Sequence, residues 1–512
     1  MTVVNNPIRP GYYPDPSICA VGEDFYLVNS TFTYFPGVPI FHSKDLKNWR
    51  QIGNVLNRKS QISLDEQWHS GGIFAPSIRY HKGIFYMITT NVGGGGNFYV
   101  TATNPAGPWS EPYFLKDAQG IDPSLFFDED GTAYYVGQRA NSEGEKYWGD
   151  CEVWLQEIDL NEGKLLGESK VLWRGSMKHA NWVEGPHLYK IGEYYYVMIA
   201  EGGTGFEHSI TIARSKSLLG EYQSCPQNPI VTHRHFGRSY PITNTGHGDL
   251  VQDQNGEWYM VLLASRPKQG YCNMGRETFL AKVEWEDGWP VVNPMEGCIT
   301  ETVTVPLEER ETIFEPSCYH FYEKEWEPQF IFLHNPDESA YERRTGEGVL
   351  RLYARKERMD DLVSSTYASI RQQHHCFRAS TRMRPSIVES EEAGMALLQS
   401  NEYYITAFAC KEDGQTYVKA EMRKKEERIS LAKVLVEEGP IEFVFLGEEE
   451  QVTIRYRQNG QDMLLVEKED ITALSTEVAG GFVGCTIGMY ITSNGKEGTG
   501  FADFHWLSYE GK

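Results

Sequence analysis

Three acidic residues in the first half of the chain have types and positions that suit acid–base chemistry. Asp15 and Asp122 each stand directly before a proline that opens a short apolar segment, and Glu184 stands one residue further back, before Gly185 and Pro186. Hydrolysis of a glycosidic bond needs two carboxyl groups in different protonation states, because one protonates the leaving oxygen while the other activates water. The three residues are therefore candidates for a hydrolytic site, provided that the fold brings them together.

The elements that would position these acids belong to an internal repeat. At intervals of roughly 50 to 60 residues, an apolar run, a tight turn and an aromatic strand recur in PSICAVGEDFYLVNS, PSIRYHKGIFYMITT, PSLFFDEDGTAYYVG, PHLYKIGEYYYVMIA and GDLVQDQNGEWYMVLLA. The turns contain the Gly, Asp and Asn that tight hairpins need for positive φ. Each interval accommodates a four-stranded antiparallel sheet, and radial repetition of such sheets forms a propeller. The sequence therefore predicts an all-β fold that begins with a five-bladed β-propeller over residues 1 to 295.

In a propeller the innermost strands of all blades surround the axis, so the residues before their starts converge at one mouth of the channel. The five equivalent positions hold Asp15, Ala75, Asp122, Glu184 and His247. Three carboxylates in one small ring raise each other's pKa and disfavour full ionisation. Such a destabilising arrangement is typical of functional sites, so we expect the three acids to form an active site at the axis.

Each of these residues also has an ordinary structural interpretation. Asp-Pro is common turn chemistry, so Asp15 and Asp122 taken singly are typical turn residues. Considered alone, His247 would be a core histidine that forms hydrogen bonds. Its place in the ring favours a role in the site, either in contact with the substrate or as a ligand of a bound ion. The agreement in register across several blades favours a shared site over separate structural roles.

Four further residues near these motifs have the chemistry of a sugar site. Phe32, Phe74 and Trp182 are core residues by default, but rings beside a sugar site often stack on pyranose faces. Arg276 is a surface cation by default, and beside three carboxylates it would hold one of them in place or bind sugar hydroxyls. We therefore predict that all four contact the substrate.

The repeat ends after Val292, and the rest of the chain has a different pattern. Residues 296 to 317 have few core positions and are predicted to form an extended linker. Over residues 318 to 512, short strand-like pieces such as YYITAFAC, IEFVFLG and VTIRYRQ alternate with charged or glycine turns, which predicts a β-sandwich. The charge-rich stretch KAEMRKKEERISLAKV has a composition compatible with a helix, but we interpret it as a solvated pair of strands.

Composition argues against several classes of function. Asp and Glu number 71 against 48 Lys and Arg, and a net charge of −23 would repel phosphate backbones, so no nucleic-acid partner is expected. No run approaches the ~18 apolar residues of a membrane span, and the start of the chain does not resemble a signal peptide. We therefore expect a soluble, cytoplasmic protein with no membrane partner. The nine cysteines lack a CxxC pair, which favours free thiols over disulfides or a metal–thiolate site.

Three motifs taken together, YYPDPS, GIDPSLFFDEDG and VEGPHLYK, resemble the signature motifs of glycoside hydrolase family 43. The resemblance covers nearly the whole chain: MGRETFLAKVEWEDGW is similar to the propeller of its β-xylosidase and α-L-arabinofuranosidase members, and FADFHWLSYEG to their C-terminal, concanavalin-like β-sandwich. It implies that Asp15 is the general base, that Glu184 is the general acid, and that Asp122 tunes and orients this acid. It also implies that His247 and Arg276 shape the site.

Two positions depart from the family pattern. Relatives commonly have tryptophan where this chain has Phe74, which implies a smaller or displaced sugar platform and leaves substrate choice open. The stretch CYHFYEKEW has no acidic residue before its phenylalanine, where the sandwich of relatives usually carries acidic residues that can serve a calcium ion. A structural Ca²⁺ near Asp503 and an ion near His247 are therefore both left open, and no cofactor is expected for the chemistry itself.

The resemblance implies an exo-acting, inverting enzyme that releases xylose from the non-reducing end of short β-1,4-xylo-oligosaccharides. The alternative within this class is mainly α-L-arabinofuranosidase activity, and the two activities can coexist. A hypothesis of another class is a non-catalytic carbohydrate-binding propeller, against which the presence of all three acids argues. We expect the sandwich to pack beside the channel mouth and to close one side of the pocket. A small oligosaccharide is the expected partner, and the sequence leaves a homo-oligomer open.

Overall fold

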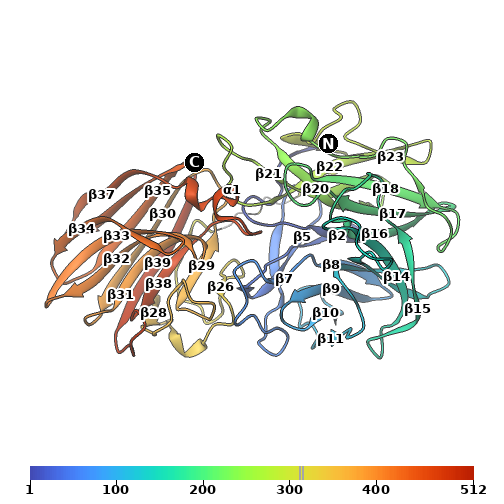
Figure 1. Ribbon diagram of the computed structural model, residues 1–512. Helices are drawn as coiled ribbons and strands as arrows, with labels where there is room; N and C mark the ends of the chain where they lie inside the picture. Colours follow the sequence, from blue (N-terminus) through green and yellow to red (C-terminus); the bar gives the residue numbers. More distant parts are fainter. Residues whose placement is uncertain (311–312, 314–315) are drawn as a thin grey trace.

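The computed structural model describes residues 1–310, 313 and 316–512. It contains two β-sheet lobes that lie side by side: a propeller, blue through green in Figure 1, and a sandwich, orange and red. Both lobes are built almost entirely from antiparallel strands, so the predicted all-β class is confirmed. Among the described residues, no helix has the length and apolar character needed to cross a membrane.

Five antiparallel sheets form the blades, as predicted. The first contains β2 (Ser17–Val21), β3 (Asp24–Val28), β5 (Gly37–Ser43) and β6 (Arg50–Leu56), and the second β7 (Gly72–Ile73), β8 (Ser77–His81), β9 (Ile84–Val92), β10 (Gly96–Ala102) and β11 (Tyr113–Phe114). The third contains β12 (Ile121–Phe127), β13 (Ala133–Ala140), β14 (Cys151–Asp159) and β15 (Lys164–Trp173). The fourth contains β16 (Glu184–Ile191), β17 (Tyr194–Glu201), β18 (Ser209–Ser215) and β19 (Gln223–Ser224), and the fifth β20 (Thr243–Gln252), β21 (Trp258–Ser265), β22 (Glu277–Glu286) and β23 (Trp289–Val292).

Each neighbouring pair of blades encloses a hydrophobic cluster, and this packing closes the ring. Between the first and fifth blades, Phe41 and Tyr259 share a cluster with Val4 and Val305. These two valines lie on β1 (Thr2–Asn5) and β24 (Thr302–Val305), which pair antiparallel with each other. The two ends of the propeller chain are thus joined by backbone hydrogen bonds as well as by apolar burial.

The predicted linker, residues 296 to 317, therefore contains a strand that packs against the propeller. Val303 and Val305 of β24 are buried, whereas the threonines that alternate with them are exposed. This two-residue alternation is what a half-buried strand requires. Residues 311, 312, 314 and 315 of the linker lie outside the described part of the chain.

A buried ionic cluster fills the axis beneath the predicted site. Asp249 on β20 accepts hydrogen bonds from Ser17 Oγ at 2.6 Å, Arg79 Nη1 at 2.8 Å and Tyr189 Oη at 2.7 Å. These three donors belong to the first, second and fourth blades. Because a buried charge is stable only when it is paired and hydrogen-bonded, the cluster ties four innermost strands to one another.

The mouth of the channel has a repeated backbone feature. Asp15, Asp122, Gly185 and His247, which occupy equivalent places before or within the innermost strands, have φ values of 51°, 52°, 57° and 46°. Pairing of the third, fourth and fifth innermost strands shifts register at these points. Bulges of this kind re-aim side chains beside functional sites, and left-handed backbone in residues other than glycine is strained. The mouth is therefore shaped to present these side chains.

The second lobe consists of two packed sheets with one large core between them. One sheet contains β25 (Cys318–Tyr319), β27 (Tyr341–Arg344), β28 (Val349–Tyr353), β39 (Phe501–Gly511), β30 (Cys376–Ser386), β35 (Ile441–Glu448), β36 (Gln451–Gln458) and β37 (Gln461–Asp470). The other contains β29 (Tyr367–Arg371), β38 (Thr486–Thr492), β31 (Glu392–Ser400), β32 (Tyr403–Glu412), β33 (Gln415–Lys424) and β34 (Glu427–Val436). The charge-rich stretch forms β33 and β34, which confirms the predicted strand pair.

The two lobes are joined by backbone pairing and by close packing. Strand β4 (Tyr34–Phe35) of the propeller pairs with β26 (Phe332–Leu333). The loop between the short helix α1 (Thr476–Ala479) and β38 lies against the propeller, where Cys485 N donates a hydrogen bond to Asn273 O at 2.7 Å. A Cβ atom at Gly484 would lie 2.3 Å from Met274 O, so only glycine permits this approach. The contact brings a sandwich loop to the channel mouth.

Candidate active site

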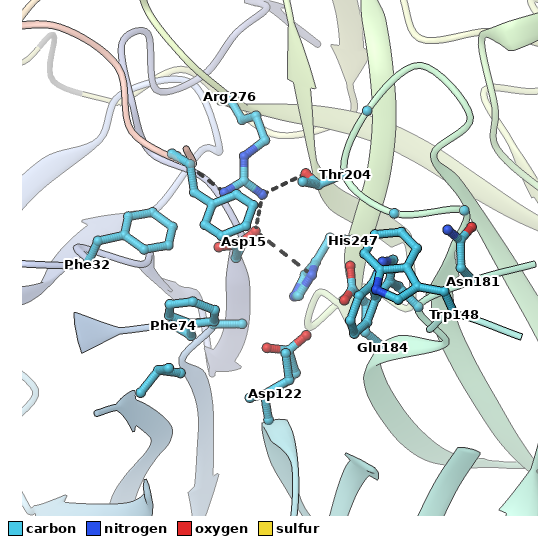
Figure 2. Close-up of a pocket in the computed structure, with 18 residues that line it drawn as sticks. Asp15, Phe32, Phe74, Asp122, Trp148, Asn181, Glu184, Thr204, His247 and Arg276 are labelled. Carbon is cyan, nitrogen blue, oxygen red and sulfur yellow. Dashed lines mark hydrogen bonds and ion pairs between the residues drawn. The ribbon is translucent and has the colours of Figure 1, made fainter. Parts of the chain in front are cut away.

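A cavity of about 570 Å³ opens at the channel mouth, beside the junction of the two lobes. Its lining includes all eight residues that the sequence singled out for the site: Asp15, Phe32, Phe74, Asp122, Trp182, Glu184, His247 and Arg276. Figure 2 labels all of them except Trp182 around a common space. These residues come from all five blades and the segments between them. The fold thus brings together side chains that are up to about 260 residues apart in the sequence.

Asp15 lies in positively charged surroundings. Its Oδ1 atom accepts a hydrogen bond from Arg276 Nη1 at 2.9 Å and lies 3.9 Å from His247 Nδ1, while Ser30 Oγ donates to Oδ2 at 2.5 Å. Burial by itself raises the pKa of a carboxyl group, but the charges of Arg276 and His247 outweigh it and hold the pKa of Asp15 below its usual value. Asp15 is therefore ionised near neutral pH.

Glu184 and Asp122 lie in the opposite kind of surroundings. Removal from bulk water, followed by the negative charges of Asp122 and Asp15, raises the pKa of Glu184 well above its usual value. Burial also raises the pKa of Asp122 to about 6, an effect that His247 opposes and Asp15 reinforces. Asp122 Oδ2 accepts a hydrogen bond from Gly185 N, directly after the glutamate, at 3.2 Å. Glu184 therefore keeps its proton under conditions where Asp15 has lost its own.

One side of the cavity is a phenylalanine wall, formed by Phe32, Phe74 and Phe482. Phe32 and Phe74 belong to the propeller, and their ring centroids are 5.5 Å apart. Phe482 comes from the sandwich loop after α1, stacks on Phe32 at 5.9 Å, and accepts a hydrogen bond from Arg276 Nη2 through its carbonyl oxygen at 3.3 Å. The sandwich therefore closes one side of the pocket, as expected. Phe482 itself was not predicted from the sequence, where the glycines of GGFVG are the only local signal.

The other side of the cavity is a tryptophan wall, formed by Trp148, Asn181 and Trp182. Figure 2 shows Trp148 and Asn181 on the side of Glu184, away from the phenylalanine wall. The two indole rings meet edge to face, with centroids 5.1 Å apart, and Trp148 is 74% exposed at the rim. Trp148 and Asn181 were not predicted from the sequence. An exposed tryptophan in the polar loop NSEGEKYWGD was the signal that could have found the first of them.

His247 lies between Asp15 and the segment that carries Glu184. Its ring packs on Gly185, where an added Cβ atom would lie 2.8 Å from His247 Cε1. Within the described residues, no group of three or more His, Cys, Asp or Glu side chains is arranged to hold a metal ion. The carboxylate beside His247 is already engaged by Arg276 and Ser30. These residues do not fit the ion that the sequence left open near His247.

Asp503 is likewise a poor fit to calcium. It lies on β39 and accepts hydrogen bonds from Arg351 Nε at 2.7 Å and Nη2 at 2.9 Å, with Arg344 Nη1 at 3.9 Å. Calcium takes six to eight oxygen ligands, whereas here a guanidinium group on the neighbouring strand β28 occupies both carboxylate oxygens. The residues around Asp503 therefore do not fit the calcium ion that the sequence left open there.

The arrangement suits acid–base hydrolysis of a sugar linkage. An ionised carboxylate and a protonated carboxyl group face one partly enclosed cavity, and aromatic rings flank them on both sides. Separated pKa values of this kind distinguish a general base from a general acid. The fold and the site thus define a propeller hydrolase.

Comparison with known proteins identifies the family. Residues 4–290 match the family described as "Glycosyl hydrolases family 43", and residues 318–510 match "Beta xylosidase C-terminal Concanavalin A-like domain". The chain belongs to glycosyl hydrolase family 43, and its second lobe is a concanavalin A-like β-sandwich. The family resemblance inferred from the three motifs is therefore confirmed.

Full-length relatives support the same assignment. A Butyrivibrio fibrisolvens protein named xylosidase/arabinosidase is 49% identical over 516 residues, covering 100% of both chains. A Bacteroides ovatus protein named non-reducing end alpha-L-arabinofuranosidase BoGH43B is 37% identical over 98% of this chain and 94% of its own. The solved structure of xylan beta-1,4-xylosidase from Bacillus halodurans C-125 has a TM-score of 0.94 at 33% identity, covering 99% of this chain and 100% of that one.

Proposed function

We propose that this protein is an exo-acting, inverting glycosidase that removes xylose from the non-reducing end of short β-1,4-xylo-oligosaccharides. The observation that carries the proposal is the opposite displacement of two carboxyl pKa values in one cavity, lowered at Asp15 and raised at Glu184. The names of the relatives support a pentose substrate. The name of the Bacteroides relative favours α-L-arabinofuranosidase activity as the second candidate.

In the proposed mechanism, Asp15 takes a proton from water on one face of the sugar. Glu184 protonates the bridging oxygen on the other face, and C1 changes configuration in a single displacement. Asp122 keeps the acid protonated, because its negative charge raises the pKa of Glu184. Arg276 keeps the base ionised through the hydrogen bond to Asp15. The chemistry requires no cofactor.

The two walls give the proposed substrate its orientation. The phenylalanine wall and Arg276 hold the terminal sugar, because aromatic faces stack on sugar rings and a guanidinium group donates to hydroxyls. His247 contributes a further polar contact beside the base. The tryptophan wall, on the side of Glu184, receives the leaving group. Phe482 from the sandwich closes the pocket on the side of the terminal sugar, so only the end of a sugar chain can enter it. This favours removal of single sugars from short oligosaccharides.

A reducing compartment is the proposed location. All nine cysteines are free thiols, from Cys19 to Cys485. Free thiols persist where the cell keeps its proteins reduced. This supports action in the cytoplasm on small oligosaccharides.

The test is release of sugar from defined substrates. We expect the protein to cleave 4-nitrophenyl β-D-xylopyranoside and xylobiose, to cleave 4-nitrophenyl α-L-arabinofuranoside more slowly, and to leave the corresponding β-glucoside intact. Proton NMR of the first product from xylobiose should show α-xylose. Binding of these sugars without cleavage would make the protein a carbohydrate-binding propeller, and β-xylose as first product would contradict inversion.

A further inference from the structure

A buried carboxylate outside the cavity holds one of its walls. Glu201, the last residue of β17, has no solvent exposure. Its Oε1 atom accepts hydrogen bonds from Ser176 N at 2.5 Å and Thr211 Oγ1 at 2.6 Å, and its Oε2 atom accepts one from Met177 N at 3.0 Å. A Cβ atom at Gly175 would lie 2.8 Å from Oε1, so the backbone approaches this carboxylate through a glycine. The carboxylate thus binds the backbone of one particular segment.

That segment, residues 174–183, connects β15 to β16 and leads directly into Glu184. It carries Asn181 and Trp182 of the tryptophan wall. Both His179 and Trp182 have left-handed backbone, with φ values of 60° and 58°. For a bulky residue this conformation is strained and persists only when surrounding contacts impose it. The segment therefore needs external anchors.

Glu201 and its neighbour anchor the segment at both ends. The carboxylate of Glu201 holds Ser176 and Met177 near the start. At the other end, Gly202 N donates a hydrogen bond to Asn181 O at 2.9 Å. Strand β17 also pairs with β16, which begins at Glu184. The end of β17 therefore positions both the tryptophan wall and Glu184 beside it.

We propose that Glu201 is a positioning residue that keeps the tryptophan wall in register with Glu184 and thereby controls binding of the leaving group. The inference rests on the proposed function, in which Glu184 protonates the leaving oxygen and the wall on its side receives the departing sugar. A displacement of roughly 1 Å at such a wall can cost about 100-fold in rate. The terminal sugar, held by the phenylalanine wall on the other side, is unaffected by such a displacement.

Glu201→Gln tests this role with little change of shape. The variant replaces one acceptor oxygen with an NH₂ group that faces a backbone N–H donor. Two substrates separate the walls: xylobiose, whose leaving sugar contacts the tryptophan wall, and β-D-xylosyl fluoride, whose leaving group is a single atom. We expect the KM for xylobiose to rise roughly tenfold or more, and kcat/KM for the fluoride to stay within about twofold of wild type.

Glu391→Gln is the matched control. Glu391 is a buried glutamate of the sandwich that accepts hydrogen bonds from Val388 N at 2.8 Å, Thr499 N at 2.8 Å and Gly500 N at 2.9 Å. The same loss of backbone hydrogen bonds therefore occurs away from the cavity, and both substrates should keep their wild-type kinetics. If Glu201→Gln lowered activity on the two substrates equally, or changed neither, Glu201 would have no role in positioning.

A second variant covers the case in which Glu201→Gln does not fold. Thr211→Val removes one donor to the Glu201 carboxylate and leaves both backbone donors in place. It should raise the KM for xylobiose in the same direction but to a smaller extent, again sparing the fluoride. Equal effects on both substrates, or none, would overturn the inference. A wild-type chain that cleaved neither substrate would instead overturn the proposed function itself.

Discussion

Asp15 and Glu184 face the same cavity but are surrounded in opposite ways. Asp15, from the segment before the first blade, receives a hydrogen bond from Arg276, and its pKa is lowered in spite of burial. Glu184, at the start of the fourth blade, has its pKa raised by burial and then, among charged groups, most strongly by Asp122. Burial acts to raise the pKa of both carboxyl groups. The sign of the neighbouring charge therefore decides that the pKa of Asp15 is lowered and that of Glu184 is raised. The propeller provides a cation for one carboxyl group and an anion for the other.

The largest expected effect comes from removing each carboxyl group in turn. Asp15→Ala should lose about 10²- to 10⁴-fold in kcat on every substrate, because water needs a base whatever the leaving group. Glu184→Ala should lose as much on xylobiose but keep far more activity on 2,4-dinitrophenyl β-xyloside, whose leaving group needs little protonation. Steady-state kinetics on the two substrates measures this difference.

Folding of both alanine variants has to be established first, by circular dichroism and thermal unfolding, since an unfolded chain also lacks activity. An Asp15→Ala variant that retained the activated substrate, together with a Glu184→Ala variant that lost it, would reverse the two roles. If neither change mattered, the catalytic site would lie elsewhere.

A smaller effect is expected from removing the cation on the base side. In Arg276→Met the pKa of Asp15 should rise, because the largest of the charges that oppose the effect of burial would be gone. The acidic limb of kcat/KM against pH should therefore move to higher pH. Arg276 also lowers the pKa of Glu184, so the alkaline limb should move in the same direction. Arg58→Met, at a surface ion pair, is the control, and an unmoved acidic limb would contradict the role of Arg276.

On the acid side, removal of the neighbouring anion should have the opposite sign. Asp122→Asn removes a negative charge that raises the pKa of Glu184, so this pKa should fall. The alkaline limb of kcat/KM should then move to lower pH while the acidic limb stays in place. A rate profile over the full pH range measures both limbs. An alkaline limb identical to wild type would show that Asp122 does not tune the acid.

The smallest expected effect is on stability. A carboxyl group whose pKa is raised by folding destabilises the protein as pH increases from its unfolded pKa to its folded pKa. Glu184→Gln removes that loss, so its Tm should match wild type near pH 4 and exceed it by a few degrees, on the order of 2 to 4 °C, at pH 8. Calorimetry at the two pH values measures the difference. Glu207→Gln, at an exposed position, should show none, and a lower Tm for Glu184→Gln at pH 8 would refute the effect.

The acids and the blades could be predicted from the sequence because each blade repeats the same short signal. A proline or glycine opens the apolar inner strand, so the shared register of the repeats is enough to place Asp15, Asp122 and Glu184 at one mouth of the channel. The left-handed backbone at Asp15 and Asp122 carries no such signal. At Asp122 it accompanies a bulge in the pairing of β12 with β13, and such a bulge depends on how neighbouring strands pair.

Contacts between segments that are far apart in the chain could not be predicted from the sequence. Phe482 reaches the cavity only because Gly484 lets the sandwich loop approach Met274, which is a property of the assembled lobes. Asp503 accepts hydrogen bonds from Arg351 because β28 and β39 are neighbours in the sheet. The local sequence of neither strand indicates this pairing. In both cases the deciding neighbour lies more than about 100 residues away, and local pattern contains no information about it.

The central claim, that the protein holds one carboxyl group ionised and the other protonated, can be measured directly. Infrared difference spectra of wild type minus Glu184→Gln, taken near neutral pH, should show the C=O stretch of a protonated carboxylic acid. Wild type minus Asp15→Asn should show the bands of a carboxylate and no protonated C=O stretch. Carboxylate bands in both spectra, or the protonated band in the Asp15 spectrum, would contradict the account.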